Sequence, residues 1–190
     1  MCRHVRWSLP PEAGAKLIII RTYHESDAGT VGQLIANTYG EFNLDFASPE
    51  EKQKLLGPFQ FARSTDEAQR AAIAQAIRAA MVFVAEHDGE IVGVLRGRTE
   101  RIQSLFVRGD YQRRGIGRQL VERCEQECIR QGAQTIKVAS TLLAVPFYLA
   151  LGYRRTTGIR NGWSFEGAGL RYQPMKKKVS VTSQALQVNP

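Results

Sequence analysis

The residues from Gln112 to Gly117, QRRGIG, place two glycines and two arginines immediately before an amphipathic segment. A glycine costs about 1 kcal/mol relative to alanine in a helix interior, so two of them at a helix start need a reason. The first N–H groups of a helix have no partner within it, and the helix dipole adds positive potential there. Glycines let an anion approach these groups and accept left-handed torsions, while Arg113 and Arg114 can add charge. The segment therefore predicts a phosphate-binding site.

Three phosphate-binding designs compete for this segment. A dinucleotide-binding loop needs a third glycine, but Leu120 stands three residues after Gly117; a Walker loop needs Gly-Lys-Ser/Thr, which is absent. The remaining pattern resembles the Q/R-x-x-G-x-G/A signature of the GNAT superfamily of N-acetyltransferases, which bind acetyl-coenzyme A (acetyl-CoA). The flanking QSLFVRGDYQRRGIGRQLVERCE and the later AVPFYLALGY are similar to that family's strand-loop-helix and to its A-x-x-F-Y-x-x-x-G-F/Y segment.

The resemblance implies how acetyl-CoA would bind as cosubstrate. Two parallel strands, RIQSLFV and TIKVAS, would splay apart, with a bulge near Ser104 and Leu105, and the pantetheine arm would lie between them. Thr141 stands where many relatives have asparagine, and its hydroxyl, with that of Ser140, is expected to hydrogen-bond the pantetheine amides. The other expected cofactor contacts lie on the first strand and the phosphate loop: Leu105, Phe106, Val107, Gln112, Arg113, Arg114, Gly115, Ile116, Gly117 and Arg118.

The resemblance also implies a catalytic residue. An amine attacks the thioester and expels a thiolate, which a general acid can protonate. Tyr148 stands where related enzymes carry this acid, and a phenol with a pKa near 10 is protonated at neutral pH. The alternative is a core aromatic residue beside Phe147. The general base stays unassigned, with Glu86, His87 and Glu100 as weak candidates.

The expected acceptor site lies between two segments, residues 42–63 and residues 158–169. Both are rich in aromatic side chains, which either wall a pocket or anchor long loops on the sheet. The first segment lacks the acidic cluster expected for aminoglycosides or polyamines, and nothing in the sequence selects a small amine over a peptide as the acceptor. The aromatic and polar residues concerned are Phe42, Phe46, Phe59, Phe61, Arg160, Asn161, Trp163 and Glu166.

Length, composition and net charge limit the classes of protein to which this sequence can belong. The 190 residues suit one domain, and the longest aliphatic run, Leu17 to Ile20, is too short for a membrane span or a signal core. We expect a cytoplasmic protein. The net charge of +8 favours an anionic partner, but no aromatic-basic interleaving supports nucleic acid. Cys124 and Cys128 read as buried apolar residues, and no metal is expected. A homodimer is left open.

The order of predicted elements gives the fold class. A strand and two helices precede three strands with tight connections, and a helix, a strand, a short helix and two strands follow. Hairpins imply antiparallel pairs, whereas the helix between RIQSLFV and TIKVAS implies a parallel crossover. We therefore expect an α/β fold with a mixed, mostly antiparallel sheet of about seven strands at residues 16–179, between a flexible leader (1–15) and a flexible tail (180–190). A non-catalytic acyl-CoA sensor or interaction module of the same fold is the alternative to the enzyme.

Overall fold

The computed structural model describes residues 17–180. The predicted leader and all but the first residue of the predicted tail lie outside this range. Three-10 turns join several of the regular elements. The helices and strands are β1 (Ile19–Thr22), α1 (Ala28–Phe42), α2 (Pro49–Leu56), α3 (Glu67–Ile77), β2 (Met81–His87), β3 (Glu90–Arg98), β4 (Arg101–Val107), α4 (Ile116–Arg130), β5 (Thr135–Thr141), α5 (Val145–Ala150), β6 (Arg154–Arg155), β7 (Arg160–Ser164) and β8 (Gly167–Lys178).

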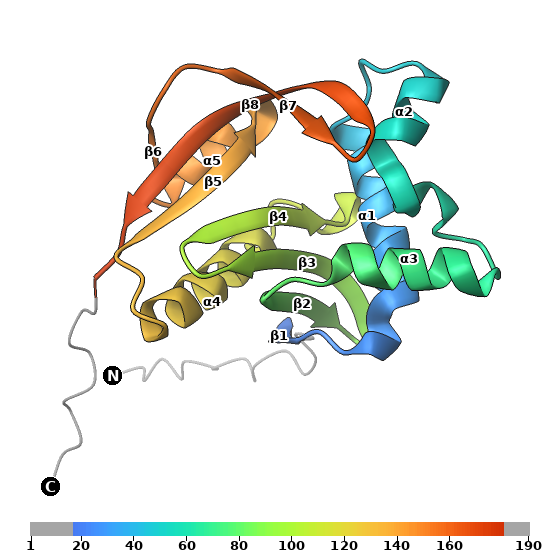
Figure 1. Cartoon of the computed structure of the whole chain (residues 1–190). Coiled ribbons are helices and arrows are strands. Elements are labelled where there is room, and N and C mark those ends of the chain that lie inside the picture. The colour runs from blue at the N-terminus through green and yellow to red at the C-terminus, as the bar shows by residue number, and fades with distance from the viewer. Residues whose placement is uncertain (1–16, 181–190) are drawn as a thin grey trace, which may run out of the picture.

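The strands form one eight-stranded sheet in the order β1-β2-β3-β4-β5-β8-β6, with β7 paired to β8. Every neighbouring pair is antiparallel except β4 and β5, which are parallel. Helices α1 and α3 cover one face of the β2–β4 half, and α4 covers the other face (Figure 1). The predicted mixed α/β fold is therefore confirmed. The sheet holds one strand more than the seven expected, because β7 lies inside residues 158–169, where no strand was expected.

The sheet opens between its two parallel strands. β4 and β5 pair only at Arg101 with Lys137 and at Ile102 with Val138, after which they diverge (Figure 1). The register of β3 against β4 shifts so that Gln103 is an extra residue between Ile102 and Ser104. A bulge bends the strand that carries it. The predicted splay is confirmed, and the bulge lies beside the predicted position.

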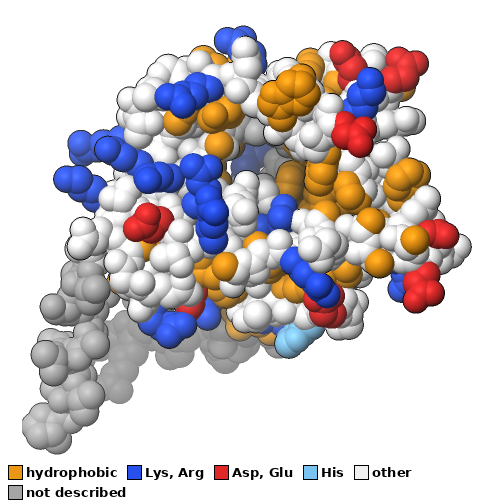
Figure 2. Space-filling view, viewed as in Figure 1, with side chains coloured by type: hydrophobic (Ala, Val, Ile, Leu, Met, Phe, Trp, Pro, Cys, Tyr) orange, Lys and Arg blue, Asp and Glu red, His pale blue; other side chains and the backbone are white. Residues whose placement is uncertain are grey.

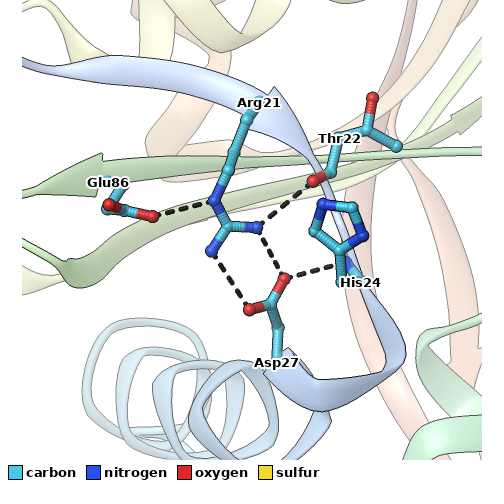
Figure 3. A network of polar contacts seen from close by, with 5 residues as sticks. All are labelled: Arg21, Thr22, His24, Asp27 and Glu86. Atoms are coloured by element: carbon cyan, nitrogen blue, oxygen red, sulfur yellow. Dashed lines mark hydrogen bonds and ion pairs between the residues drawn. The ribbon is translucent and has the colours of Figure 1, made fainter.

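The closed half of the sheet is held by a polar network and a tight hairpin. Arg21 of β1 donates to Glu86 of β2 at 2.8 Å and to both carboxylate oxygens of Asp27 at 2.7 and 3.1 Å (Figure 3). Asp27 in turn accepts the backbone N–H of His24, so the entry to α1 is tied to the sheet. The Asp88–Gly89 turn has positive φ at both residues, as a two-residue hairpin requires.

A row of exposed cations crosses the sheet from β3 to β6 at the end where β4 and β5 are still paired, on the face away from α4. Cross-strand register places five basic residues side by side over β3, β4, β5, β8 and β6, a span of about 19 Å at the usual strand spacing. None of them has a side-chain hydrogen bond or ion pair with another described residue. We call this set the basic row; Figure 2 shows Lys and Arg side chains along the left part of this face. Its members are Arg98, Arg101, Lys137, Lys176 and Arg154.

Candidate functional site

The N-terminus of α4 presents free backbone donors. Gly115 precedes the helix with φ of 83°, and no heavy atom lies within 4 Å of the position its Cβ would take. Because this residue has no side chain, none caps the helix, and the first N–H groups have no intrahelical acceptor. These groups belong to Ile116, Gly117 and Arg118. The left-handed torsion expected of a loop glycine is therefore observed at Gly115.

The loop before α4 is shaped by its own side chains. Arg113 has φ of 60°, and Gln112 donates from Nε2 to the carbonyl oxygen of Val107 at 3.1 Å. The guanidinium of Arg114 lies 4.8 Å from the ring centroid of Tyr111. Gln112 thus fastens the loop to the end of β4, and Arg114 stacks on an aromatic ring.

A first cavity of about 550 Å³ lies between the start of α4 and the end of β4. It is lined by all of the predicted cofactor-contacting residues except three, one of which, Ser140, is buried and donates from Oγ to the backbone carbonyl oxygen of Thr141 at 2.8 Å. Arg114 stacks on Tyr111 instead, and the Ile116 side chain is buried in the core, with only its backbone at the helix start. The predicted residues that line it are Leu105, Phe106, Val107, Gln112, Arg113, Gly115, Gly117, Arg118 and Thr141.

Gly117 serves a different purpose from Gly115. Its φ is not positive, and a Cβ at this position would lie 3.3 Å from the ring of Phe147. That ring also lines the first cavity, as do Thr38, Phe42 and Asn43 at the end of α1. Phe42 and Asn43 belong to a segment expected at the acceptor site, and none of the four residues was expected at the cofactor site, because only the folded sheet brings α1 and α5 to the same opening. Gly117 therefore makes room for the cavity wall as well as for an approaching anion.

A second cavity, of about 380 Å³, adjoins the first through the opening between β4 and β5. The two cavities share part of their lining, and the second extends toward β7 and β8. Figure 2 shows a hollow in the middle of this face, bordered by hydrophobic and basic side chains. The shared residues are Asn43, Leu105, Phe106, Thr141 and Ala144.

Tyr148 lines the second cavity from α5. Its ring packs edge-on against Phe147 and Tyr153, at 5.0 and 5.4 Å between centroids, and the side chain is buried. Its hydroxyl has no hydrogen-bond partner among the described residues. Burial raises the pKa of Tyr148 well above its ordinary value, so the phenol stays protonated. The residue thus belongs to the core and also faces the cavity.

No Asp, Glu or His side chain lines either cavity in the described part of the chain. Glu86 is held by Arg21 on the closed half of the sheet. His87 contacts the hydroxyl of Tyr111 through Nδ1 at 2.9 Å, and Glu100 lies in the turn between β3 and β4. None of the three candidate bases is brought to the site.

The aromatic residues of the two predicted acceptor segments differ in burial and in whether they line a cavity. Phe59 is buried and packs edge-on against Phe165 at 5.8 Å, which anchors its loop. Both also line the second cavity, together with Trp163, whose side chain is largely exposed. Phe46 and Phe61 are exposed and line neither cavity.

Two properties of residues 17–180 bear on metal binding and on membranes. No cluster of three or more His, Cys, Asp or Glu side chains could hold a metal ion there. No helix in this range combines the length and the apolar character that a membrane crossing needs. Cys124 and Cys128 are buried as free thiols, as predicted.

Comparison with known proteins gives the same family as the motif. The model of the acetyltransferase (GNAT) domain matches residues 47–179. A search of curated protein sequences finds no significant match.

Solved structures share the fold at low sequence identity. A GCN5-related N-acetyltransferase from Rhodopseudomonas palustris is 22% identical with a TM-score of 0.68, covering 93% of this chain and 100% of that one. PaiA N-acetyltransferase from Thermoplasma acidophilum, in complex with coenzyme A, is 18% identical with a TM-score of 0.61 (86% and 99% covered). YncA from Salmonella typhimurium, with its cofactor acetyl-CoA, is 16% identical with a TM-score of 0.60 (87% and 96% covered). The family model spans most of this chain, and the chain therefore belongs to the GNAT acetyltransferase family.

Proposed function

We propose that this protein is an N-acetyltransferase that moves the acetyl group of acetyl-CoA to a primary amine, with both substrates bound at once. The observation that carries the proposal is the continuity of the two cavities. The first begins at the free N–H groups of α4, and the second reaches Tyr148. Together they connect the proposed pyrophosphate site at the start of α4 to the proposed site of acetyl transfer beside Tyr148.

The residues present fit the cosubstrate, which supplies an acetyl group activated as a thioester. The N–H groups at the start of α4, with Arg113 and Arg118 on the cavity wall, would hold the pyrophosphate. Beyond Ile102, β4 is unpaired on the side of β5, so the backbone of Leu105 to Val107 is free to pair with an extended pantetheine arm. The Thr141 hydroxyl lies across the opening. Two of the structural relatives hold coenzyme A and acetyl-CoA, respectively, which supports this assignment.

Tyr148 would act as the general acid. As the amine nitrogen bonds to the acetyl carbon and the carbon–sulfur bond breaks, the phenol gives its proton to the departing sulfur. Burial keeps this proton in place at neutral pH. Because no carboxylate or imidazole of residues 17–180 lines the cavities, the proton of the amine would leave through water.

The same lack of a base favours a second candidate, the acyl-CoA sensor or interaction module without catalysis. The two are separated by incubating the protein with acetyl-CoA and a panel of amines and measuring free coenzyme A thiol. Sustained thiol release with any amine contradicts the sensor, whereas binding without release across the panel contradicts the enzyme.

Binding itself is tested by two matched glycine variants. Gly115 and Gly132 have φ of 83° and 87°, and neither has an atom within 4 Å of a built Cβ. Asp at either position therefore meets similar backbone strain, but only Gly115→Asp places a carboxylate at the predicted pyrophosphate. At about 100 times its Kd, acetyl-CoA should stabilise the protein by about 2.7 kcal/mol, or roughly 5–10 °C in Tm for a domain of this size.

We expect the Tm increase to persist in Gly132→Asp and to be lost in Gly115→Asp. The comparison uses the ligand-induced change, because both variants lower the Tm of the free protein. A wild-type protein whose Tm does not respond to millimolar acetyl-CoA would contradict the proposal.

A further inference from the structure

The second cavity carries a cation without a counter-ion. Arg96 of β3 is half-buried and lines this cavity. Its Nε donates to the carbonyl oxygen of Ile77 at 2.9 Å, which fixes the guanidinium at the end of α3. No carboxylate among the described residues pairs with it. A guanidinium has five N–H donors, so its two terminal nitrogens keep their donors for a ligand.

Burial makes this arrangement costly in the free protein. Loss of water around the guanidinium lowers the pKa of Arg96, although the group stays charged at neutral pH. A partly desolvated charge is normally paired in a folded protein. An anion bound in the cavity would supply the missing partner, and a planar carboxylate matches the guanidinium fork with two parallel hydrogen bonds.

A second polar group lies beside Arg96. Ser104 is directly opposite Arg96 in the β3–β4 register, and residues opposite each other project to the same face. Its Oγ is buried without a hydrogen-bond partner, and the residue lines the same cavity. Buried hydroxyls usually have a partner, so this one needs an explanation. A carboxylate held by Arg96 could also accept a hydrogen bond from the Ser104 hydroxyl.

The remaining residues that line the second cavity also favour an anionic ligand. The one other charged side chain among the described lining residues is Arg171 of β8, and the walls are otherwise aromatic, aliphatic or neutral polar. A polyamine would meet two cations and no carboxylate here. The volume of about 380 Å³ suits a small molecule.

We infer that the acceptor is an amino acid or a similar amine with a carboxylate a few bonds from its nitrogen, and that Arg96 and Ser104 bind this carboxylate. This inference rests on the proposed acetyl transfer. Ser104 is next to Leu105, so the bound carboxylate lies within about two residue spacings, roughly 7 Å, of the backbone assigned to the pantetheine arm. Trp163 and Phe165 would contact an apolar or aromatic side chain of the acceptor.

The test compares acceptors that differ only in the carboxylate. Initial rates of thiol release are measured with phenylalanine, leucine and glutamate, each against its α-amide. The wild-type protein should prefer the free carboxylate, and Arg96→Met should lower kcat/KM for the acids by about 10- to 100-fold while sparing the amides, as expected for hydrogen bonds to a charged group. Arg96→Lys should recover part of the preference. Arg98→Met is the control, since this cation lies two residues along β3, outside the cavity.

A binding measurement keeps the inference separate from catalysis. N-acetylphenylalanine, a product of the expected reaction, should raise the Tm of wild type and Arg98→Met but not of Arg96→Met. An equal loss of rate with acids and amides in Arg96→Met would overturn the inference, because it would show that Arg96 only holds Ile77. Acetyl-CoA binding together with amides used as well as acids would overturn it too, while leaving the proposed function standing. No response to acetyl-CoA would overturn both.

Discussion

The Tyr148→Phe substitution removes the hydroxyl that we propose as the general acid. That hydroxyl has no hydrogen-bond partner among the described residues, and the edge-on ring contacts with Phe147 and Tyr153 do not depend on it. Since this hydroxyl forms no hydrogen bond with the described residues, its loss should be nearly neutral for folding, and we expect the Tm to stay within about 2 °C of wild type. The variant therefore isolates chemistry from stability.

The expected effect on turnover follows from the leaving group. General acids contribute about 10²- to 10⁴-fold. A thiolate whose parent thiol has a pKa of about 8.5 departs fairly well unaided, so we expect the lower end, about 100-fold in kcat. Thiol release under saturating acetyl-CoA measures kcat, and titration of the free enzyme measures acetyl-CoA affinity, which should not change. Full turnover in Tyr148→Phe would refute the acid role, and a parallel loss of acetyl-CoA affinity would show that the residue shapes the cavity instead.

Three further predictions concern stability. Lys177 pairs with the buried Glu125 at 2.6 Å, so Lys177→Met should cost about 3 kcal/mol in urea unfolding and Lys177→Met with Glu125→Leu should recover most of it; equal losses would show that the pair contributes nothing. Lys176 lies between two cations of the basic row, so Lys176→Glu should raise the unfolding free energy by about 0.5–1 kcal/mol at low salt and less at high salt; a decrease would contradict the repulsion. The ion pair with Arg21 lowers the pKa of Asp27, so its stabilisation is full above the unfolded value of about 3.9 and is lost as pH falls further; unfolding free energies at pH 6 and pH 3 should differ less in Asp27→Asn, and an unchanged difference would exclude this pair as the cause.

Local signals in the sequence predicted most of the fold. The Asp88–Gly89 turn, the apolar runs of β2 and β3 on either side of it and the glycines before α4 each specify their conformation within a few residues. Helix α2 was missed, although Ser48 and Glu51 form a capping box at its start; that S-x-x-E pattern was legible in the sequence. Strand β7 gave no such signal, because RNGWS contains Gly162 and becomes a strand only by pairing with β8.

In the candidate site, too, the sequence predicts some residues and not others. The phosphate loop is contiguous in sequence, so its residue types and spacing were enough to place it. Arg96 was not predictable, because its role depends on the register that sets it opposite Ser104 and on the end of α3 that accepts its Nε–H. Both are long-range consequences of folding. The acceptor side of such a site therefore needs the structure.

Amide hydrogen exchange with and without acetyl-CoA tests the central claim most directly, because it reports which backbone N–H groups the ligand covers. We expect slower exchange in two separate segments, residues 104–107 on the open side of β4 and residues 113–118 at the start of α4, with little change along the basic row. Protection confined to the basic row, or none in either segment at saturating acetyl-CoA, would contradict it.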